Sequence, residues 1–241
     1  MLIDWVLTDL TVRLTPEEVW RCLGPSGSAK DSLAGEVSDV AAEASGLCAP
    51  SAVARSLQIT GIRRGTVAFE ARIEATGRML PHIFDGAAGG VFLVATAGGE
   101  IERRTGALFA QGDPVRAIIM DAAGSAAAMN VFSQLVERVV GSLRAAGLKV
   151  GPCAKPGTDA WDIEGQRAVF KAVPADMAGV RLLDSLLMSP QKSQSGLVPF
   201  GETLRVVFDP GASPCRVCSA SRCPMRVEAY AGRALGGQPA P

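Results

Sequence analysis

Apolar residues recur at helical spacing in several parts of the chain and predict its helices. Thr15 is expected to cap the first of them, because Pro16 follows at the tolerated first position and Glu18 completes a capping box. Further helices are predicted at 31–47, 100–109, 114–146 and 162–173. In the long helix that begins at Pro114, the small residues Gly124 and Ser125 are the only expected interruption, where another helix or a ligand can approach.

Alternating apolar and polar residues predict two strands at 57–62 and 67–73, joined through the turn Arg63-Arg64-Gly65. The continuous apolar run 91–96 predicts a strand that is buried on both faces and therefore central in its sheet. Two more strands are expected at 180–187 and 197–208.

The predicted strands flank a helical middle in mixed order, without the regular strand–helix alternation of a parallel doubly wound sheet. We therefore expect an α+β fold. The strands at 91–96, 180–187 and 197–208 should belong to one sheet and pack on the helix that begins near Pro114. A single domain is expected over 1–228, followed by a disordered tail at 229–241.

Composition narrows the classes of partner. The chain has 241 residues, 48% of them hydrophobic, which is enough for a full core. The 24 basic residues balance the 24 acidic ones, so no basic field exists to attract nucleic acid or an anionic membrane. No apolar run reaches the ~18 residues of a membrane span, and the N-terminus lacks the features of a signal peptide. We expect a cytoplasmic protein with reduced cysteines and neither nucleic-acid nor membrane partners.

Several common catalytic signatures are missing from the sequence. The single histidine, His82, excludes multi-histidine metal sites and most Ser-His triads, and its place after a proline favours a structural role. The glycine-rich run 86–90 precedes a strand, whereas a phosphate-binding loop leads from a strand into a helix. Gly-x-Ser-x-Gly does not occur. The sequence therefore supports neither a hydrolase nor a nicotinamide enzyme.

Three cysteines, Cys215, Cys218 and Cys223, lie close together in the Cys-rich segment 213–226. A two-residue gap lets two thiolates chelate one ion from a turn, so the spacing predicts a zinc site or ligation of an iron–sulfur cluster. The fourth ligand would be Cys153, another cysteine, a water or a partner's side chain. The alternative is three reduced surface thiols in a flexible tail.

The segment 188–196 reads Met-Ser-Pro-Gln-Lys-Ser-Gln-Ser-Gly. Proline, lysine, glycine and serines are unusual within a core strand, and the composition is typical of backbone that lines a site. Together with the cysteines, this segment places the candidate chemistry in the C-terminal half of the chain.

Four segments in this order resemble the activation (reactivation) domain of cobalamin-dependent methionine synthase, in the stand-alone form that some bacteria encode separately. They are 95–101 (ATAGGEI), 121–127 (DAAGSAA), 155–161 (KPGTDAW) with 164–167 (EGQR), and 179–185 (GVRLLDS) with 188–196. The three-cysteine cluster also resembles that of the stand-alone members. The resemblance covers 91–226, and the first ninety residues share only the coarse order of elements.

The resemblance implies a helmet-like α+β domain with a curved, mainly antiparallel sheet packed on long helices. In the family, this domain binds S-adenosylmethionine and docks over the cobalamin of a partner, a corrinoid-binding protein or the methionine synthase core. It also implies an electron from flavodoxin or ferredoxin that reduces the inactive Cob(II) state, and a methyl group from S-adenosylmethionine that traps the reduced cobalt. The one-electron reduction of Cob(II) is thermodynamically unfavourable, and the irreversible methyl transfer that follows drives it to completion. The protein would contribute positioning and exclusion of water, which suits a chain without a catalytic histidine or carboxylate pair.

The resemblance also indicates which residues correspond to the family's ligand contacts, and several of them differ. The loop arginine that holds the ligand carboxylate falls at Cys153, the loop tyrosine at Thr158, and the helix glutamate that contacts the ligand amino group at Met129. Losing both charged partners should cost several kcal/mol of binding free energy. Lys155 offers a compensating charge, although its position in the loop is not that of the arginine. The expected cofactor-binding residues are Met129, Cys153, Pro156, Gly157, Thr158, Trp161, Lys192 and Ser193. We expect Gly157, Thr158, Trp161, Lys192 and Ser193 to line one concave surface that Met129 faces from the long helix.

Three functions remain open at this point. The chain is an activation protein that uses S-adenosylmethionine through altered contacts, a non-enzymatic partner of a corrinoid protein, or a redox accessory with a metal or cluster on Cys215, Cys218 and Cys223. The third function is compatible with either of the others.

Overall fold

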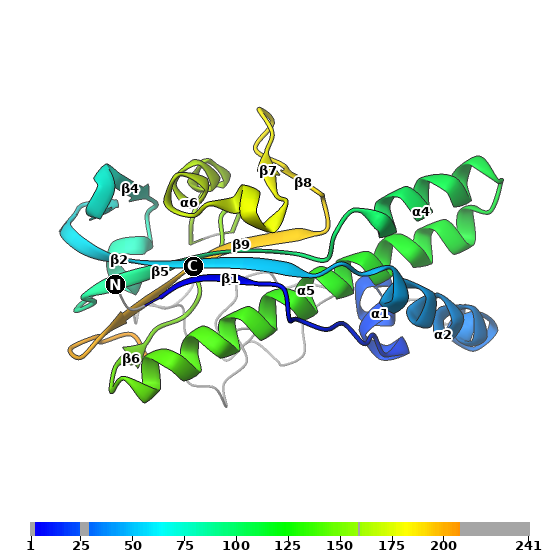
Figure 1. The fold of residues 1–241 in the computed structure, drawn as a ribbon, viewed down its shortest axis with the longest axis horizontal. Helices are drawn as coiled ribbons and strands as arrows, with labels where there is room; N and C mark the ends of the chain where they lie inside the picture. The colour runs from blue at the N-terminus through cyan, green and yellow to red at the C-terminus, as the bar shows by residue number, and fades with distance from the viewer. Residues whose placement is uncertain (1–2, 25–28, 159, 208–241) are drawn as a thin grey trace, which may run out of the picture.

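The computed structural model describes residues 3–24, 29–158 and 160–207. The Cys-rich segment 213–226 and the tail 229–241 lie outside these residues, so the metal prediction and the predicted disorder concern parts that are not described. Within the described residues, one sheet carries helices on both faces (Figure 1). The predicted α+β fold is confirmed.

The sheet has seven strands in the order β4-β3-β2-β5-β9-β6, with β1 also paired to β2, and every pairing is antiparallel. The strands are β1 (Asp4–Leu7), β2 (Ser51–Arg63), β3 (Thr66–Phe69), β4 (Ile73–Thr76), β5 (Gly89–Thr96), β6 (Lys149–Val150) and β9 (Ser193–Gly201). All eight residues of β5 are buried, as the apolar run predicted, because β2 and β9 flank this strand and both of its faces are covered.

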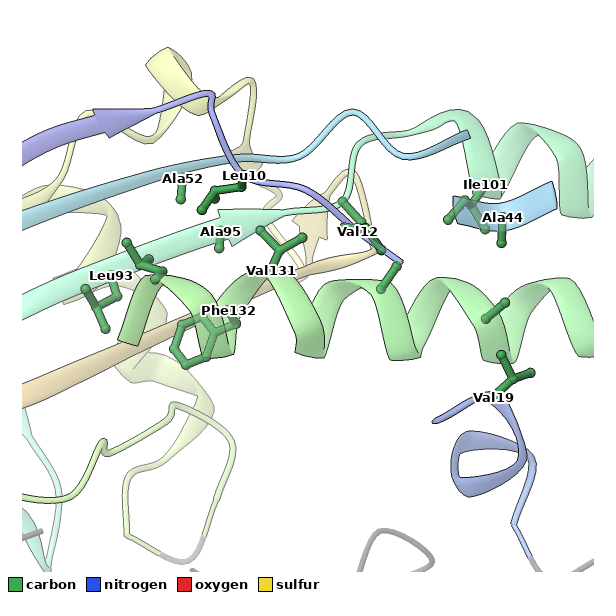
Figure 2. Close-up of a cluster of buried hydrophobic side chains, with 14 of the residues drawn as sticks. Leu10, Val12, Val19, Ala44, Ala52, Leu93, Ala95, Ile101, Val131 and Phe132 are labelled. Carbon is green, nitrogen blue, oxygen red and sulfur yellow. The ribbon is translucent and has the colours of Figure 1, made fainter. Parts of the chain in front are cut away.

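Two hydrophobic cores lie on opposite faces of the sheet, and the alternation of side chains along β5 supplies both. Leu93 and Ala95 belong to the first core, and Phe92 and Val94 to the second. Figure 2 shows the first core, where Val131 and Phe132 of the long helix approach Leu93 and Ala95.

Helices α1 (Pro16–Leu23), α2 (Ala29–Leu47), α4 (Glu100–Ala110) and α5 (Pro114–Ala145) form or border the first core. The second core is covered by α3 (Leu80–Ile83), the 3-10 turns η2 (Ile163–Gly165) and η3 (Ala175–Ala178), and α6 (Gln166–Ala172). The capping box of Thr15 and Glu18 is present as predicted. Arg116 of α5 ties α2 to the core by ion pairs with Glu36 and Glu43, at 2.5 and 2.7 Å.

Helix α5 is continuous, so the expected interruption at Gly124 and Ser125 is wrong. Gly124 instead permits a close approach, because a Cβ there would lie 2.8 Å from both Ile101 Cγ2 and Lys192 Cε. By length and composition α5 is the one helix among the described residues that could cross a membrane. Its apolar side chains are mostly buried inside the protein, the usual pattern for the core helix of a globular domain.

The predicted hairpin is confirmed, but its second half is broken. Strand β2 begins earlier than expected, at Ser51, and turns into β3 through residues 64–65. The 3-10 turn η1 (Glu70–Arg72) then separates β3 from β4, because Ala71 and Arg72 both have positive φ angles, 56° and 57°.

The strand predicted at 180–187 is wrong. This stretch folds into a separate two-stranded hairpin, β7 (Arg181–Leu182) with β8 (Met188–Ser189). Leu183 N–H donates to the Leu187 carbonyl across a tight turn, and both side chains are exposed. The predicted strand 197–208 is displaced, since β9 already begins at Ser193 and ends at Gly201. Val180 is buried in the second core, whereas residues 181–187 are half-buried or exposed and do not join the seven-stranded sheet.

Candidate functional site

Strand β9 presents alternate side chains to opposite faces of the sheet, and this alternation divides the predicted site residues. Gly196 faces α5, because a Cβ at this position would lie 2.9 Å from the Phe132 ring. Ser195 points to the other face, where its hydroxyl donates to Gln166 Oε1 of α6 over 2.8 Å. The alternation thus places Lys192 and Gln194 on the α5 side and Ser193 on the α6 side.

Lys192 reaches α5 with a buried side chain whose charge is already neutralised. Its Nζ lies 2.8 Å from Asp121 Oδ1 and 3.2 Å from Ser125 Oγ. Its backbone N–H donates to Glu102 Oε1 of α4 over 2.9 Å. Only 10% of the lysine side chain is exposed, against 57% of the Asp121 side chain. Lys192 therefore anchors the start of β9 to two helices.

Ser193 is buried and makes two internal hydrogen bonds. Its hydroxyl lies 2.8 Å from Thr96 Oγ1 on β5 and 2.7 Å from the Pro190 carbonyl. These contacts hold the entry of β9 against the end of β5, and they leave Ser193 on the sheet face opposite to Lys192.

The segment that follows β6 continues along the free edge of β9. Ala154 and Leu197 exchange both backbone hydrogen bonds at 2.9 Å, and both side chains belong to the second core. Because side chains alternate along an extended chain, Cys153 and Lys155 on either side of Ala154 both face α5. The thiol of Cys153 packs near Phe132 and Gly196. Glycine is needed at position 196 because a Cβ there would lie 2.6 Å from the sulfur.

Burial dominates the chemistry of Cys153. It raises the pKa of the thiol to about 11, although the nearby Lys155 acts in the opposite direction. The thiol is therefore protonated at neutral pH, and its surroundings do not favour the thiolate that a metal ligand requires.

Lys155 lies over the ring of Phe132, with its Nζ 4.4 Å from the ring centroid. The same Nζ donates a 2.6 Å hydrogen bond to Gln194 Oε1. Burial lowers the pKa of Lys155, and the neighbouring Cys153 offsets this only in part. Across the described residues, no carboxylate lies within ion-pair distance of this ammonium.

The Pro156–Gly157 turn is exposed at the edge of the sheet. Gly157 has a φ of +83°, and its N–H donates to the Trp161 carbonyl over 2.8 Å. The exposed Thr158 closes the same turn, donating its hydroxyl proton to the Lys155 carbonyl. The backbone N–H groups of Gly157 and Thr158 therefore form hydrogen bonds within the turn itself.

Trp161 is 1% exposed and belongs to the second core, so its side chain cannot line an open groove. The glycines Gly77 and Gly165 make room for the indole, and its Nε1 has no hydrogen-bond partner among the described residues. Trp161 and Ser193 lie on the α6 side of the sheet, whereas Lys192 lies on the α5 side. The expectation that these residues line one concave surface is therefore wrong.

Met129 is half-buried on α5, four residues after Ser125 and three before Phe132. Residues at these spacings share one side of a helix, so Met129 belongs to the side that meets Lys155 and Lys192. By these contacts and this helical spacing, Met129, Cys153 and Lys192 all belong to the α5 side of β9. We call this group, together with Phe132, Lys155, Gln194 and Gly196, the β9-edge site.

Sequence reasoning missed Phe132 and Gln194 and gave little weight to Lys155. The available signal was the spacing of two between Cys153 and Lys155, which puts both on one face of an extended segment. Metal-ligand groups of three or more His, Cys, Asp or Glu are not found in the described ranges. Cys215, Cys218 and Cys223 lie outside those ranges.

No protein-family model and no curated protein matches this chain. Among solved structures, the fold is similar to the crystal structure of the MetH reactivation domain bound to AdoHcy, with a TM-score of 0.59. The match covers 76% of this chain and 68% of that one, at 16% sequence identity. At this identity the likeness is one of fold, and it agrees with the resemblance read from the sequence.

Proposed function

We propose that this protein binds S-adenosylmethionine at the β9-edge site and assists the reductive methylation of a corrinoid carried by a partner protein, a methionine synthase core or a related methyltransferase. The observation that carries the proposal is the shared fold with a reactivation domain whose crystal structure holds AdoHcy. The four sequence segments that resemble that family support the same role.

The chemistry balances with one electron and one methyl group. An external donor, for which flavodoxin or ferredoxin is the candidate, supplies the electron that completes the pair on the partner's cobalt. The carbon–sulfur bond of S-adenosylmethionine breaks as the methyl group moves to the metal, and S-adenosylhomocysteine leaves. No proton moves, so the reaction needs orientation and exclusion of water rather than a general acid or base.

The described residues suit that division of labour. The β9-edge site combines an ammonium, an amide and apolar groups, and its thiol is protonated at neutral pH. The positions that resemble the family's charged contacts, Cys153 and Met129, carry no charge here. Binding must therefore rest on other residues, and we expect the affinity to be lower than two charged contacts would give.

The test is reconstitution with a cobalamin-loaded methionine synthase core that lacks its own activation domain. With a chemical reductant and S-adenosylmethionine, this protein should convert the partner's Cob(II) absorption spectrum to that of methylcobalamin. Omitting the protein or the methyl donor gives the control. Calorimetry with S-adenosylhomocysteine measures binding separately, so absence of both binding and conversion would refute the proposal.

The neutral residues at 129 and 153 favour a second candidate, a corrinoid-protein partner that no longer uses the methyl donor. This protein would then bind the cobalamin-loaded core in sedimentation or calorimetric experiments, without any conversion to methylcobalamin. The same reconstitution therefore distinguishes the two candidates.

A further inference from the structure

Among the residues that the structure describes, the ammonium of Lys155 has no carboxylate partner, which distinguishes it within the β9-edge site. Its partners are neutral, namely the amide oxygen of Gln194 at 2.6 Å and the ring of Phe132 at 4.4 Å from the centroid. Lys192, two residues before Gln194, differs because its ammonium is paired with Asp121 at 2.8 Å. Within residues 3–24, 29–158 and 160–207, one of the two lysines on this side of β9 is thus paired with a carboxylate and the other is not.

A half-buried cation without a counter-ion destabilises the folded state, because lost hydration is not fully replaced. Burial accordingly lowers the pKa of Lys155. A ring face and a neutral amide recover part of that loss, but an anion would recover more. The arrangement around Lys155 is therefore more stable once an anionic group from outside lies against its Nζ.

The surroundings indicate the kind of anion. In the described part of the chain, the Nε2 of Gln194 makes no hydrogen bond, so a bound group with two oxygens can accept from Nε2 and from Lys155 Nζ together. Met129, which is half-buried on α5, provides apolar surface beside this ammonium, and the ring of Phe132 beneath it is buried in the first core. A carboxylate on a short apolar chain matches this combination better than a bare inorganic anion does.

Lys155 also lies where it can take over a missing contact. Cys153 occupies the position that resembles the family's carboxylate-binding arginine, and the bridge at Ala154 turns Lys155 to the same side of the sheet. We propose that Lys155, assisted by Gln194, binds the carboxylate of the S-adenosyl amino acid in place of the residue at 153. This inference rests on the proposed function and assigns the residue that carries its specificity for the amino-acid end of the ligand.

Calorimetry with two ligands tests the assignment. S-adenosylhomocysteine carries the carboxylate, whereas 5′-methylthioadenosine has the same adenosyl thioether without the amino-acid end. For Lys155→Met we expect the affinity for S-adenosylhomocysteine to fall about tenfold or more, the usual cost of a charged hydrogen bond, with unchanged affinity for 5′-methylthioadenosine. Lys155→Arg should retain most of the affinity for S-adenosylhomocysteine, and Lys149→Met, at an exposed lysine of β6, should change neither affinity.

A thermal unfolding scan of the free proteins gives a second measurement. Removing an uncompensated charge should leave the unfolding midpoint of Lys155→Met equal to or above that of the unmodified protein. S-adenosylhomocysteine should raise the midpoint of the unmodified protein but not that of Lys155→Met. Lys155→Gln serves in the same way if the Met variant does not fold. Equal binding of S-adenosylhomocysteine by the unmodified and Lys155→Met proteins overturns the role of Lys155 alone. Failure of the unmodified protein to bind either ligand overturns the proposed function, and the role of Lys155 with it.

Discussion

Lys192 Nζ lies 2.8 Å from Asp121 Oδ1, and this contact fastens the start of β9 to the long helix α5. The two partners are unequally buried, since 10% of the lysine side chain but 57% of the aspartate side chain is exposed. Removing the aspartate and removing the lysine should therefore lower the free energy of unfolding by different amounts.

Asp121→Ala leaves the Lys192 ammonium buried without a counter-ion, and we expect it to lower the free energy of unfolding by about 2 kcal/mol. Lys192→Met leaves an aspartate that water can still solvate, so its cost should be smaller. Urea denaturation measures both, with Asp39→Ala, at an exposed aspartate of α2 that forms no ion pair in the described structure, as the control. A larger loss for Lys192→Met than for Asp121→Ala would contradict this account of the pair.

Two glycines of α5 provide a matched test of the close approach at Gly124. A Cβ at Gly124 would lie 2.8 Å from Ile101 Cγ2, so Gly124→Ala should lower stability by about 1–3 kcal/mol through overpacking. At Gly141 nothing lies within 4 Å, and Gly141→Ala should raise stability by about 0.5–1 kcal/mol through helix propensity. Thermal or chemical unfolding gives both numbers. Equal and stabilising effects at the two positions would show that α4 and Lys192 do not pack as closely on α5 as described.

Restoring the charged contacts that the resemblance implies should strengthen ligand binding. The double change Met129→Glu with Cys153→Arg supplies an anion for the ligand's ammonium and a second cation for its carboxylate. We expect calorimetry with S-adenosylhomocysteine to show at least a tenfold gain in affinity, about 1.4 kcal/mol. Met129→Gln with Cys153→Gln gives the uncharged comparison. If the charged and uncharged pairs bind alike, the correspondence of these two positions with the family's contacts is wrong.

The pH dependence follows from the lowered pKa of Lys155. In the free folded protein this lysine loses its proton below the ordinary lysine pKa near 10.5, so between the two values the unfolded chain binds more protons. Lys155 therefore contributes a stability that rises with pH through this window. A bound carboxylate needs the protonated lysine, so the affinity for S-adenosylhomocysteine should fall as pH rises through the same window.

Calorimetry at a series of pH values checks this prediction, with Lys155→Arg for comparison because arginine keeps its proton there. The amino group of the ligand titrates in both proteins alike. Parallel pH profiles for the two proteins would therefore exclude Lys155 as the titrating contact.

The spacing of Cys215, Cys218 and Cys223 predicts metal binding, which elemental analysis can test directly. We expect elemental analysis of the purified protein to find zinc or iron, lost when Cys215, Cys218 and Cys223 are changed together to Ser. X-ray absorption at a zinc site should give sulfur distances of about 2.3 Å, and a cluster would colour the protein brown. Cys48→Ser serves as the control because burial raises the pKa of that thiol to about 11. Metal content equal in all variants would leave the three cysteines without a metal role.

Most of the fold could be predicted from long periodic patterns of apolar residues. The helices α2, α4 and α5 and the strand β5 each have many residues in one period, so the positions of these elements follow from local sequence. The prediction of a strand at 180–187 was wrong because a short, largely apolar stretch contains no information on whether a neighbouring strand exists to pair with it. Here the chain turns back on itself within a few residues and leaves Leu183 and Leu187 exposed.

The sequence by itself determined the α+β class, the central buried strand and the segments that resemble the activation domain, because these depend on periodicity and on contiguous motifs. Only the tertiary structure decided which of the two lysines forms an ion pair within the described residues. Lys192 has its partner Asp121 71 positions away, and Lys155 meets Phe132 and Gln194 from two other elements. Whether a charge is balanced depends on distances across the fold, and residue order within a motif does not contain them.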